Sequence, residues 1–385
     1  MRFLYVAARY HTNQVPIMEG LVKQGNEVMF ISQFAGQTED YSCVTPLVLG
    51  YSRLTDFIWD IIRIIKKWPK DQLGFKKVKT GLPPLLKLYR NIRDFRPDIA
   101  ILCERSVYTI FANLICRWIR ITTILYNQSP LWEGNLRNDL PHRLVRSLVP
   151  SKRITPVLGL PGAGKAIEPN AYYVPFVMPL MLAPEKKQYS KDNALRIFCV
   201  GKYEKRKNHL MLLEIINELN LNAKQKIYLT IAGELKTEKN YDYYREVQQF
   251  VTDNQLNDKV VLHKNLSRAM IFCEYEKADF FVLPSTLEPA SISQLEAMAH
   301  SLPVICSDTN GTACYIENGE NGYIFADNQK EALKRAIKMI CDNAGRIPEM
   351  GAASYRIIEE KCSFQSYLEI VKIISGIVGD DLCAR

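Results

Sequence analysis

The sequence predicts an α/β protein built from two parallel-sheet domains, and three observations carry this prediction. A chain of 385 residues is longer than one ordinary hydrophobic core accommodates. Short apolar runs typical of buried parallel strands alternate along the chain with helical patterns. The polar stretch 183–193 interrupts this alternation and has the composition of an interdomain linker. We therefore expect an N-terminal domain over residues 1–182 and a C-terminal domain over residues 194–363.

The first half opens with a strand-helix-strand unit. Pro16 stands in the first turn of the helix and Gly25 follows its end, which are typical limits of a helix. After a basic segment, the same α/β order resumes. The elements expected in this half are strands over 3–7, 27–32, 99–103 and 122–126, and helices over 16–24 and 107–119.

The loop after the first strand lies at the carboxyl end of that strand, where open α/β sheets bind their ligands. It carries Arg9, His11 and Asn13, which we expect to contact an acceptor or a phosphate. Simpler roles stay open, because Asn13 can cap the following helix and His11 can be a surface histidine.

The net charge of +9 belongs to the first half of the chain. Residues 1–185 contain 24 Lys and Arg against 14 Asp and Glu, whereas the remainder contains 26 against 27. This asymmetry indicates an anionic partner for the first half, which can be a membrane surface, a phosphorylated acceptor or a nucleic acid.

The segment 54–79 combines this basicity with apolar and aromatic residues at helical spacing from Leu54 to Trp68. The basic residues beside them are Arg63, Lys66, Lys67, Lys70, Lys76, Lys77 and Lys79. Two interpretations stay open, a helix lying in the interface of an anionic membrane and a core-facing helix with a basic outer face. Nucleic acid is disfavoured, because no helix-turn-helix, zinc-finger or stacking-platform motif accompanies the charge.

Several classes of protein are disfavoured by what the sequence lacks. No run of eighteen apolar residues occurs, so we expect no transmembrane helix, and residues 1–10 read as a first strand and not as a signal peptide. The ten cysteines are scattered without a C-x-x-C pair, which is typical of free thiols in a reducing cytoplasm. We expect neither a metal site nor a bound cofactor.

Residues 159–166 match the phosphate-loop pattern G-x-x-x-x-G-K only in part. Ala166 stands where that motif needs Ser or Thr for magnesium, and Pro169 and Pro175 break the helix that should follow. A nucleoside-triphosphatase is therefore disfavoured.

The second half alternates more regularly than the first, which predicts a parallel sheet covered on both faces. The expected strands span 195–200, 227–232, 260–262, 279–283, 303–306 and 323–325. The expected helices span 208–219, 241–254, 267–277, 291–300 and 328–342.

The first crossover of this half predicts an anion site. Gly201 ends the strand, and Lys202, Arg206 and Lys207 precede a helix that we expect Asn208 to cap. A helix N-terminus flanked by cations suits a diphosphate. Gly233-Glu234 and the run 308–312 end neighbouring strands on the same rim of the sheet.

The stretch 284–301 joins two apolar strands and carries two acids, Glu288 and Glu296. If Ser291 caps the helix, Glu288 lies in the preceding loop and Glu296 in the second turn, so that both can face one pocket. Ser293-x-x-Glu296 is an alternative capping box, in which Glu296 only satisfies backbone N–H groups. We favour the first register.

These residues carry a resemblance to a known family. The pattern L-P-S-T-x-E-P-x-x-x-x-Q-L-E-A-M-A, preceded by V-G-K-x-E-K-R-K-N-H, resembles the donor-binding half of the retaining, nucleotide-sugar-dependent glycosyltransferases with a Glu-x7-Glu motif. The similarity covers about residues 195–345. It implies the GT-B fold, in which two Rossmann-like domains face a central cleft and a C-terminal helix, here about 364–385, crosses back onto the first domain.

The resemblance also implies roles for individual residues. Glu288 would bind hydroxyls of the donor sugar, and Glu296 would accept from the ribose hydroxyls of the nucleotide. Lys207 and Lys202 would neutralise the diphosphate leaving group, because fixed charges stabilise the charge that develops as the sugar–phosphate bond breaks. The other residues expected to contact the donor are Gly201, Arg206, Gly233, Pro289, Ser291, Ile292 and Ser293.

The chain departs from the family pattern at a few positions. Lys202 stands where the family usually has Arg, and Ala290-Ser291 replaces Phe-Gly. On the acceptor side the glycine-rich first loop is absent, and Asn127 stands where the family often has His. The first two departures concern the donor site, and the last two concern the acceptor side.

The resulting prediction is a retaining hexosyltransferase that needs no metal, since no D-x-D motif occurs. It would move a sugar from a nucleotide sugar, with UDP favoured on family frequency, to a glycan or lipid-linked acceptor in cell-surface polysaccharide biosynthesis. We expect it in the cytoplasm, in one interpretation peripheral on the inner face of the membrane. The alternatives are an epimerase or phosphorylase of the same fold and a non-catalytic partner in a glycan assembly complex.

Overall fold

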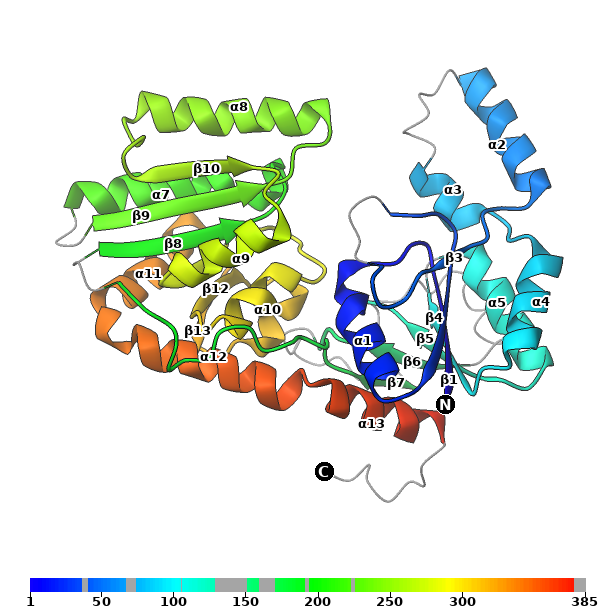
Figure 1. The fold of residues 1–385 in the computed structure, drawn as a ribbon. Coiled ribbons are helices and arrows are strands. Elements are labelled where there is room, and N and C mark those ends of the chain that lie inside the picture. Colours follow the sequence, from blue (N-terminus) through cyan, green and yellow to red (C-terminus); the bar gives the residue numbers. More distant parts are fainter. Residues whose placement is uncertain are drawn as a thin grey trace. The chain divides into compact units, whose positions relative to one another are not determined.

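The structure is a computed structural model that describes residues 1–36, 41–66, 74–104, 106–128, 151–158, 170–190, 194–222 and 226–376. The phosphate-loop-like stretch 159–166, the positions of Lys67, Trp68 and Lys70, and the end of the chain after residue 376 lie outside the described residues. The chain forms two compact units (Figure 1). Unit 1 comprises Met1–Pro156, Gly164–Val177 and Phe364–Arg385, and unit 2 comprises Val157–Ala163 and Met178–Ser363.

Unit 1 contains a seven-stranded sheet in the order β3-β2-β1-β4-β5-β6-β7, and every neighbouring pair is parallel. Apolar runs without polar alternation form its central strands, because both faces of these strands are covered. The strands are β1 (Arg2–Ala7), β2 (Glu27–Ser32), β3 (Leu47–Val48), β4 (Ile99–Cys103), β5 (Thr122–Tyr126), β6 (Lys152–Thr155) and β7 (Ala171–Tyr173). The predictions for β2, β4 and β5 are confirmed with the same limits.

Helices cover both faces of this sheet. On one face, α1 (Val15–Lys23) and α13 (Phe364–Ser375) pack on Phe3, Tyr5 and their neighbours. On the other, α4 (Leu85–Phe95) and α5 (Val107–Trp118) pack on Leu4, Val6 and their neighbours. Two further helices, α2 (Arg53–Lys66) and α3 (Gly74–Thr80), form a projection from this unit, and α2 extends away from the sheet (Figure 1).

The C-terminal helix α13 is part of unit 1, where the sequence places it. The hydroxyl groups of Tyr5 and Tyr367 lie 3.0 Å apart in a hydrogen bond. A Cβ atom on Gly20 would lie 2.3 Å from the Phe364 ring, so α1 and α13 approach closely because residue 20 has no side chain. Helix α13 therefore belongs to the core of unit 1 although it follows unit 2 in the sequence.

Unit 2 contains a six-stranded parallel sheet in the order β10-β9-β8-β11-β12-β13. Its strands are β8 (Ala194–Val200), β9 (Lys226–Gly233), β10 (Val260–Lys264), β11 (Phe280–Leu283), β12 (Val304–Ser307) and β13 (Gly322–Phe325). Its helices are α7 (His209–Asn222), α8 (Glu238–Asp253), α9 (Arg268–Lys277), α10 (Ile292–Ala299), α11 (Lys330–Asp342) and α12 (Ile347–Lys361). All six predicted strands are confirmed to within two residues at either end, whereas α12 has no counterpart in the prediction.

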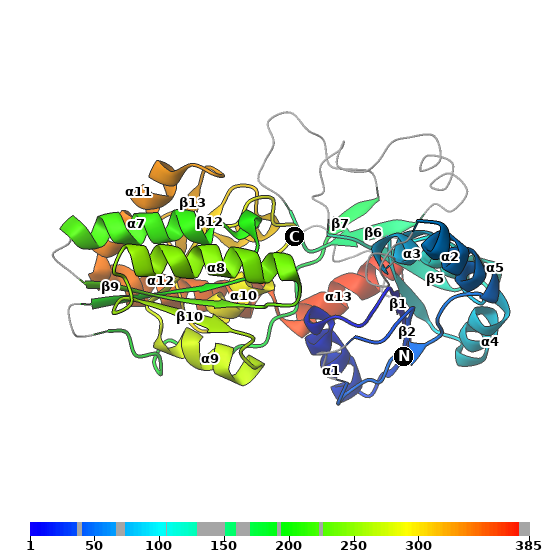
Figure 2. The ribbon, with the colours of Figure 1, turned by 90° about the horizontal axis from the view of Figure 1, so that it is seen from above.

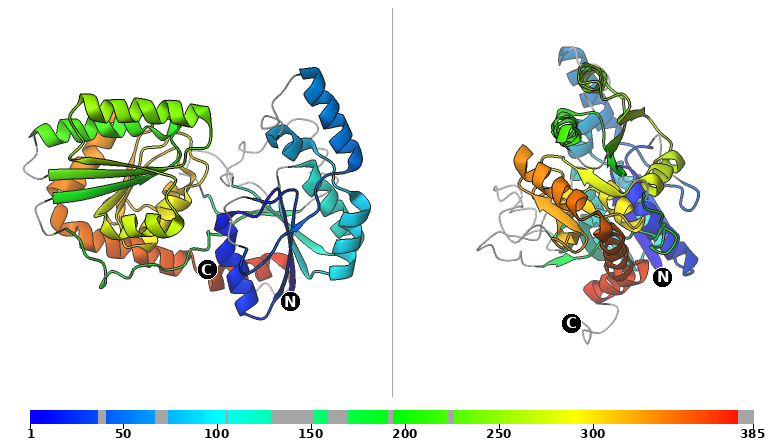
Figure 3. Two further views of the ribbon diagram at one scale, coloured as in Figure 1. Left: turned by 45° about the horizontal axis from the view of Figure 1, so that its top comes forward. Right: turned by 90° about the vertical axis from the view of Figure 1, so that its left-hand side faces the viewer.

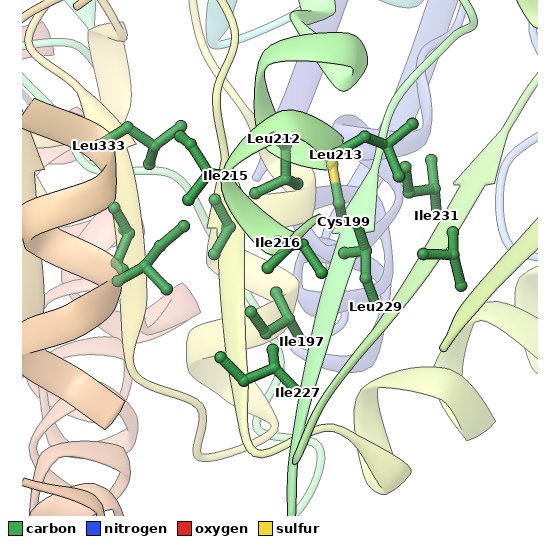
Figure 4. Close-up of a cluster of buried hydrophobic side chains, with 14 of the residues drawn as sticks. Ile197, Cys199, Leu212, Leu213, Ile215, Ile216, Ile227, Leu229, Ile231 and Leu333 are labelled. Atoms are coloured by element: carbon green, nitrogen blue, oxygen red, sulfur yellow. The ribbon is translucent and has the colours of Figure 1, made fainter. Parts of the chain in front are cut away.

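The core of unit 2 explains its layers. Residues of α7, α8 and α11 pack on inward-facing residues of the sheet, and Figure 4 shows Leu212, Leu213, Ile215 and Ile216 of α7 against strands β8 and β9. Helix α9 lies on the opposite face (Figures 2 and 3). The sheet is thus covered on both sides, and its carboxyl edge is left to the loops.

The prediction of an interdomain linker over 183–193 is wrong for its described part, because residues 183–190 pack on unit 2. The ammonium of the buried Lys187 donates to the carbonyl oxygens of Glu276 and Ala278, at 2.5 and 2.7 Å, at the end of α9. Ser190 binds Asp279 through its backbone N–H and its hydroxyl, each at 2.7 Å. Polar residues here satisfy backbone groups of the fold, whereas the sequence pattern indicated solvated chain.

Candidate functional site

The candidate site lies in unit 2, where loops follow three neighbouring strands at the carboxyl edge of the sheet. The loop after β8 carries the 3-10 helix Lys205–Lys207, the loop after β11 carries Glu288, and the loop after β12 carries the 3-10 helix Gly311–Tyr315. Because the strands are parallel and adjacent, these loops meet at one edge.

The turn after β11 has an unusual backbone that places Glu288. Leu287 adopts φ +48°, a left-handed conformation that is rare for a residue with a side chain, and it is 71% exposed. Its N–H donates to Thr309 Oγ1 at 2.9 Å, and the Glu288 carbonyl accepts from the Gly311 N–H at 2.8 Å. The exposed Leu287 and the buried Glu288 therefore point in different directions from a turn fixed by the β12 loop.

The Glu288 carboxylate is the centre of a charge cluster. Its Oε2 atom accepts from Arg206 Nη1 at 2.7 Å and is in direct contact with Lys207 Nζ. Partial burial lowers the pKa of Arg206, but the hydrogen bond and charge of Glu288 outweigh it and raise the pKa above its ordinary value. The structure thus brings together Glu288, Arg206 and Lys207, and their roles towards a donor stay predictions.

Hydrogen bonds fix the β8 and β11 loops to each other. Asn208 adopts φ +52°, and its side-chain amide donates to Pro284 O at 3.0 Å and to Thr286 Oγ1 at 2.9 Å. The Thr286 N–H donates in turn to Arg206 O at 2.8 Å. Asn208 stands directly before α7 as predicted, but its amide braces the β11 loop, so the prediction of a helix cap missed its structural role.

Two glycines of the predicted donor site are needed for packing within the protein. A Cβ atom on Gly201 would lie 3.1 Å from Lys207 Cδ, so Gly201 leaves room for the lysine side chain. A Cβ atom on Gly233 would lie 2.5 Å from the ring of the buried Tyr203. Their predicted contact with a donor remains a prediction.

Lys202 does not join the Glu288 cluster. Its ammonium lies 3.4 Å from the Glu234 carboxylate, and its side chain is 52% exposed. The predicted role of Lys202 at a diphosphate stays a prediction, and Arg206 is the second cation beside Glu288. The reason is the 3-10 turn after Glu204, which brings positions 206 and 207 back towards β11.

Ser291 caps α10, which decides between the two registers that the sequence left open. Its Oγ accepts from the Gln294 N–H at 3.2 Å, so the helix begins at Ile292 and Glu296 is not part of a capping box. In the described part of the chain, the N–H groups of Ile292 and Ser293 have no acceptor, as is usual for the first turn of a helix. Pro289 lies between this turn and Glu288.

Glu296 lies in the second turn of α10 and is mostly buried. Tyr275 Oη donates to its Oε2 at 3.3 Å, and Arg268 Nη2 lies 3.8 Å from its Oε1. Burial raises the pKa of Glu296 above its ordinary value, and the charge of Arg268 and the Tyr275 hydrogen bond offset only part of this increase. This carboxyl can accept further hydrogen bonds.

A buried polar network beside α10 was not predicted from the sequence. Gln294 Oε1 accepts from Asn310 Nδ2 at 2.5 Å and from Thr312 Oγ1 at 2.9 Å, and its Nε2 donates to Thr312 O at 2.8 Å. The three side chains are at most 2% exposed. The network joins α10 to the β12 loop, whose Gly311 N–H binds the Glu288 carbonyl. The only sequence signal for it was the polar run 308–312.

The residues predicted on the acceptor side belong to unit 1. Arg9 is half-buried, His11 is exposed, and Asn13 lies inside the 3-10 helix Thr12–Gln14. Asn13 is therefore not the cap of α1, whose N-cap is Gln14. Asn127 follows β5, and its amide donates to Glu104 Oε2 at 3.3 Å.

Two features of unit 1 near these residues were not predicted. Glu104 receives both Nε and Nη2 of the buried Arg153, at 2.9–3.1 Å, so Asn127 is part of an ion-paired cluster at the ends of β4, β5 and β6. An apolar pocket reaches under the carboxyl ends of the strands, and Asn13 is one of its lining residues with Tyr5, Ile101, Tyr126 and Tyr367.

Within the ranges that the structure describes, no group of three His, Cys, Asp or Glu side chains could hold a metal ion. The nine cysteines in these ranges are free. None of the helices described is long and apolar enough to span a membrane. The chemical resources of the site are thus a carboxylate held by two cations, a helix N-terminus and a second, protonatable carboxyl.

Comparisons with known proteins agree with this description. Residues 183–356 match the family described as glycosyl transferases group 1. The chain is 24% identical over 230 residues to the capsular polysaccharide biosynthesis glycosyltransferase CapM of Staphylococcus aureus, covering 60% of this chain and 57% of the relative. It is 27% identical over 159 residues to the UDP-Gal:alpha-D-GlcNAc-diphosphoundecaprenol alpha-1,3-galactosyltransferase of Escherichia coli, covering 40% and 38%. The matches thus span between about a quarter and 57% of the first relatives' own length.

Solved structures show the same architecture over nearly the whole chain. A glycosyltransferase from Rickettsia africae superposes with a TM-score of 0.72 at 15% identity, covering 97% of this chain and 98% of that one. The Anabaena protein Alr3699/HepE, solved in complex with UDP, superposes with a TM-score of 0.69 at 10% identity, covering 98% and 100%. The two parallel-sheet units are those of the GT-B fold. Residues 183–356, which contain the whole Glu288 cluster, are the part of the chain that matches the glycosyl transferases group 1 family.

Proposed function

We propose that the protein is a retaining glycosyltransferase that moves a sugar from a nucleotide sugar to a glycan or lipid-linked acceptor in polysaccharide biosynthesis. The observation that carries this proposal is the cluster of Glu288 with Arg206 and Lys207 beside the first turn of α10. Cations and free N–H groups at a helix start form an anion site of the kind that a diphosphate occupies. The family match of the same residues supports this assignment.

The reaction needs groups that stabilise a departing diphosphate. Breaking the bond between the sugar and the phosphate leaves positive charge on the sugar ring and negative charge on the leaving group. In the proposed mechanism Lys207 and Arg206 stabilise the diphosphate, and Glu288 holds hydroxyls of the sugar so that the acceptor reaches the anomeric carbon. These charges are fixed by the two braced loops before the reaction starts, so they stabilise the transition state without reorganising.

Glu296 is the proposed contact of the nucleotide ribose. It lies in the second turn of α10, and its carboxyl has unfilled acceptor capacity beside Tyr275 and Arg268. A ribose diol offers two hydroxyl donors to one carboxylate. The binding of such a diol favours the ionised form of Glu296, which connects donor binding to pH.

The names of relatives and structural neighbours support the identity of the nucleotide and of the acceptor. UDP is the favoured nucleotide, because a structural neighbour was solved with UDP and a relative is named for UDP-Gal. That relative is also named for a diphosphoundecaprenol acceptor, and this supports a lipid-linked acceptor at the inner face of the membrane. We propose that the transfer needs no metal ion.

Acceptor-dependent release of nucleotide tests the reaction. A thermal-shift screen of UDP, GDP, ADP and their sugars first selects the donor, because a ligand at 100 times its dissociation constant stabilises the protein by about 2.7 kcal/mol. Nucleotide release that requires acceptor, with unchanged rates in EDTA and an anomeric configuration preserved in the product, is the expected result. Release without acceptor, or conversion of the donor sugar alone, would instead indicate an epimerase or a phosphorylase.

Variants separate catalysis from a purely structural role in an assembly complex. Glu288→Ala and Lys207→Ala should each reduce kcat/KM by a factor of about 100 to 1,000, the range found when one fixed charge-stabilising donor is removed. Lys205→Ala is the matched control, because this lysine belongs to the same 3-10 turn but its side chain is 79% exposed and faces Glu246. Full activity of the Glu288 variant would show that Glu288 is not part of the catalytic machinery.

A further inference from the structure

Helix α2 presents an apolar stripe to solvent that the fold of unit 1 does not use. Six large side chains of this helix recur at spacings of three or four residues and are between 40% and 73% exposed. They are Leu54, Phe57, Ile58, Ile61, Ile64 and Ile65. On a helical wheel they share one side, because residues three and four apart lie above each other.

The attachment of α2 shows that this stripe points away from unit 1. Thr55 is the one buried residue of the helix, and the half-buried Trp59 and Ile62 follow it on the same side. Thr55 Oγ1 accepts from the Leu82 N–H at 3.0 Å, and Lys77 lies 2.7 Å from Asp56. The side that faces the protein is thus different from the apolar stripe, so the core-facing interpretation of this segment is wrong.

The base of the α2–α3 projection is rigidly held. The Ser52 N–H donates to Leu82 O at 2.9 Å, and the ring of Tyr51 packs on Gly81, where a Cβ atom would lie 2.5 Å away. Tyr51 also donates to Gln33 at 2.8 Å. These contacts hold the N-terminal end of α2 against unit 1, and the helix extends from there (Figure 3).

The charges beside the stripe decide which partner fits it. Residues 53–80 contain eight Lys and Arg against three Asp. Of the described ones, Arg53 borders the stripe on α2, Arg63 and Lys66 lie on the opposite side of α2, and Lys77 and Lys79 lie on α3. An exposed aliphatic stripe on a segment with this excess of cations fits the boundary between acyl chains and anionic headgroups.

We propose that α2 docks the protein on an anionic lipid bilayer, with its apolar stripe in the acyl boundary and the cations of α2 and α3 at the headgroups. A protein partner that covered the stripe would need no surrounding excess of cations, whereas a surface of anionic lipid does. This inference does not rest on the proposed reaction, because docking needs neither donor nor acceptor. It adds a membrane-binding element that the family match, which starts at residue 183, does not contain.

Vesicle binding of the full chain tests this proposal. The probe is vesicles of phosphatidylcholine with about a third phosphatidylglycerol, compared with phosphatidylcholine alone, in a flotation assay without donor. We expect binding to the anionic vesicles, at least tenfold weaker binding to the neutral ones, and a loss as salt is raised. Equal binding to both vesicles, or none to the anionic ones, would overturn the proposal.

Matched variants assign the binding to α2. Ile61→Asn with Ile65→Asn should reduce binding at least tenfold, whereas Leu221→Asn, on the exposed Leu221 of unit 2 (77%), should not change it. Arg63→Gln with Lys66→Gln should weaken binding to the anionic vesicles several-fold, with Lys338→Gln on an exposed residue of α11 as its control. Circular dichroism confirms that each variant is folded.

Size-exclusion chromatography separates the proposal from self-association. If the stripe is an interface between two copies of the chain, the wild type is a dimer that the Ile61 and Ile65 substitutions dissociate. That result, or unchanged vesicle binding of this double variant, would refute docking through α2. A wild type whose oligomeric state the substitutions leave unchanged, together with lost vesicle binding, would support it.

Discussion

Lys207 and Glu288 form a buried ion pair in which only 8% of each residue is exposed to solvent. The two residues are 81 positions apart in the chain, and the pair exists because the loops after β8 and β11 end at one edge of the sheet. Taking two charges out of water is costly, and the cost is compensated only while both partners are present. The pair therefore makes the stability of unit 2 depend on the same residues that would bind a donor.

The two halves of this pair should not be equivalent. Glu288→Gln leaves the buried Lys207 ammonium without its carboxylate partner, and we expect a loss of about 3 kcal/mol in the free energy of unfolding. Lys207→Met leaves Glu288 with Arg206, 2.7 Å away, and should cost less. Urea denaturation of both variants and of the double variant measures this. Equal losses in the two single variants, or losses that simply add, would show that the pair is not coupled as described.

Donor binding should depend on the protonation of Glu296. Because burial raises the pKa of this carboxyl above its ordinary value of 4.5, it becomes neutral at a higher pH than an exposed glutamate. We expect KM for the nucleotide sugar to increase as the pH falls through this raised pKa, since a neutral carboxyl accepts ribose hydroxyls less well. In Glu296→Gln, KM should be high at every pH and lack this inflection.

Protonation of Glu296 should weaken donor binding but stabilise the folded protein, and the stability measurement serves as the control. A carboxyl with a raised pKa in the folded state binds its proton more tightly there than in the unfolded chain. Its contribution to the free energy of unfolding is present at low pH and is lost as the pH rises through the folded pKa. In the wild type, KM and the contribution of Glu296 to the free energy of unfolding should therefore both fall as the pH rises through this pKa. A contribution to stability that increased with pH would contradict this assignment.

The fold was predictable because its strands are continuous apolar runs, and β2, β4 and β5 match their predicted limits. The meeting of Glu288 with Lys207 followed from placing both at the carboxyl ends of strands in one sheet. What the sequence could not predict depends on contacts between distant residues. From the sequence, Asn208 is expected to cap a helix, whereas in the structure its left-handed backbone directs its amide to Pro284, 76 positions away. Lys187 is likewise expected in a linker, whereas in the structure its ammonium donates to carbonyl groups at the end of α9.

Gly311 should tolerate no side chain, because the β11 and β12 loops are in backbone contact there. A Cβ atom on Gly311 would lie 1.9 Å from the carbonyl oxygen of Pro289, the residue that follows Glu288. We expect Gly311→Ala to cost about 1 to 3 kcal/mol in the free energy of unfolding, as other overpacked sites do, and to lower kcat/KM by displacing Glu288. Thermal unfolding and donor turnover measure the two effects.

Gly345→Ala is the control for that substitution. No atom lies within 4 Å of the position that its Cβ would occupy, so its stability should stay within about 0.5 kcal/mol of the wild type. If both glycine variants behave alike, the contact between Pro289 and Gly311 does not constrain the loop.

His209 should limit the stability of unit 2 in acid. Its ring is fully buried between Tyr203 and Tyr243, and neither of its nitrogens has a partner among the described residues. Burial, and to a smaller extent the charge of Lys207, lowers the pKa of His209 to about 3, so the folded protein keeps this ring neutral while the unfolded chain takes up a proton below pH 6.5. Because of this residue, the free energy of unfolding should therefore fall by about 2 kcal/mol between pH 7 and pH 5.

His209→Phe preserves the aromatic packing and has no nitrogen to protonate, so urea denaturation should show a flatter pH dependence and equal or greater stability at pH 7. The same decrease between pH 7 and pH 5 in both proteins would mean that His209 is not the group that titrates.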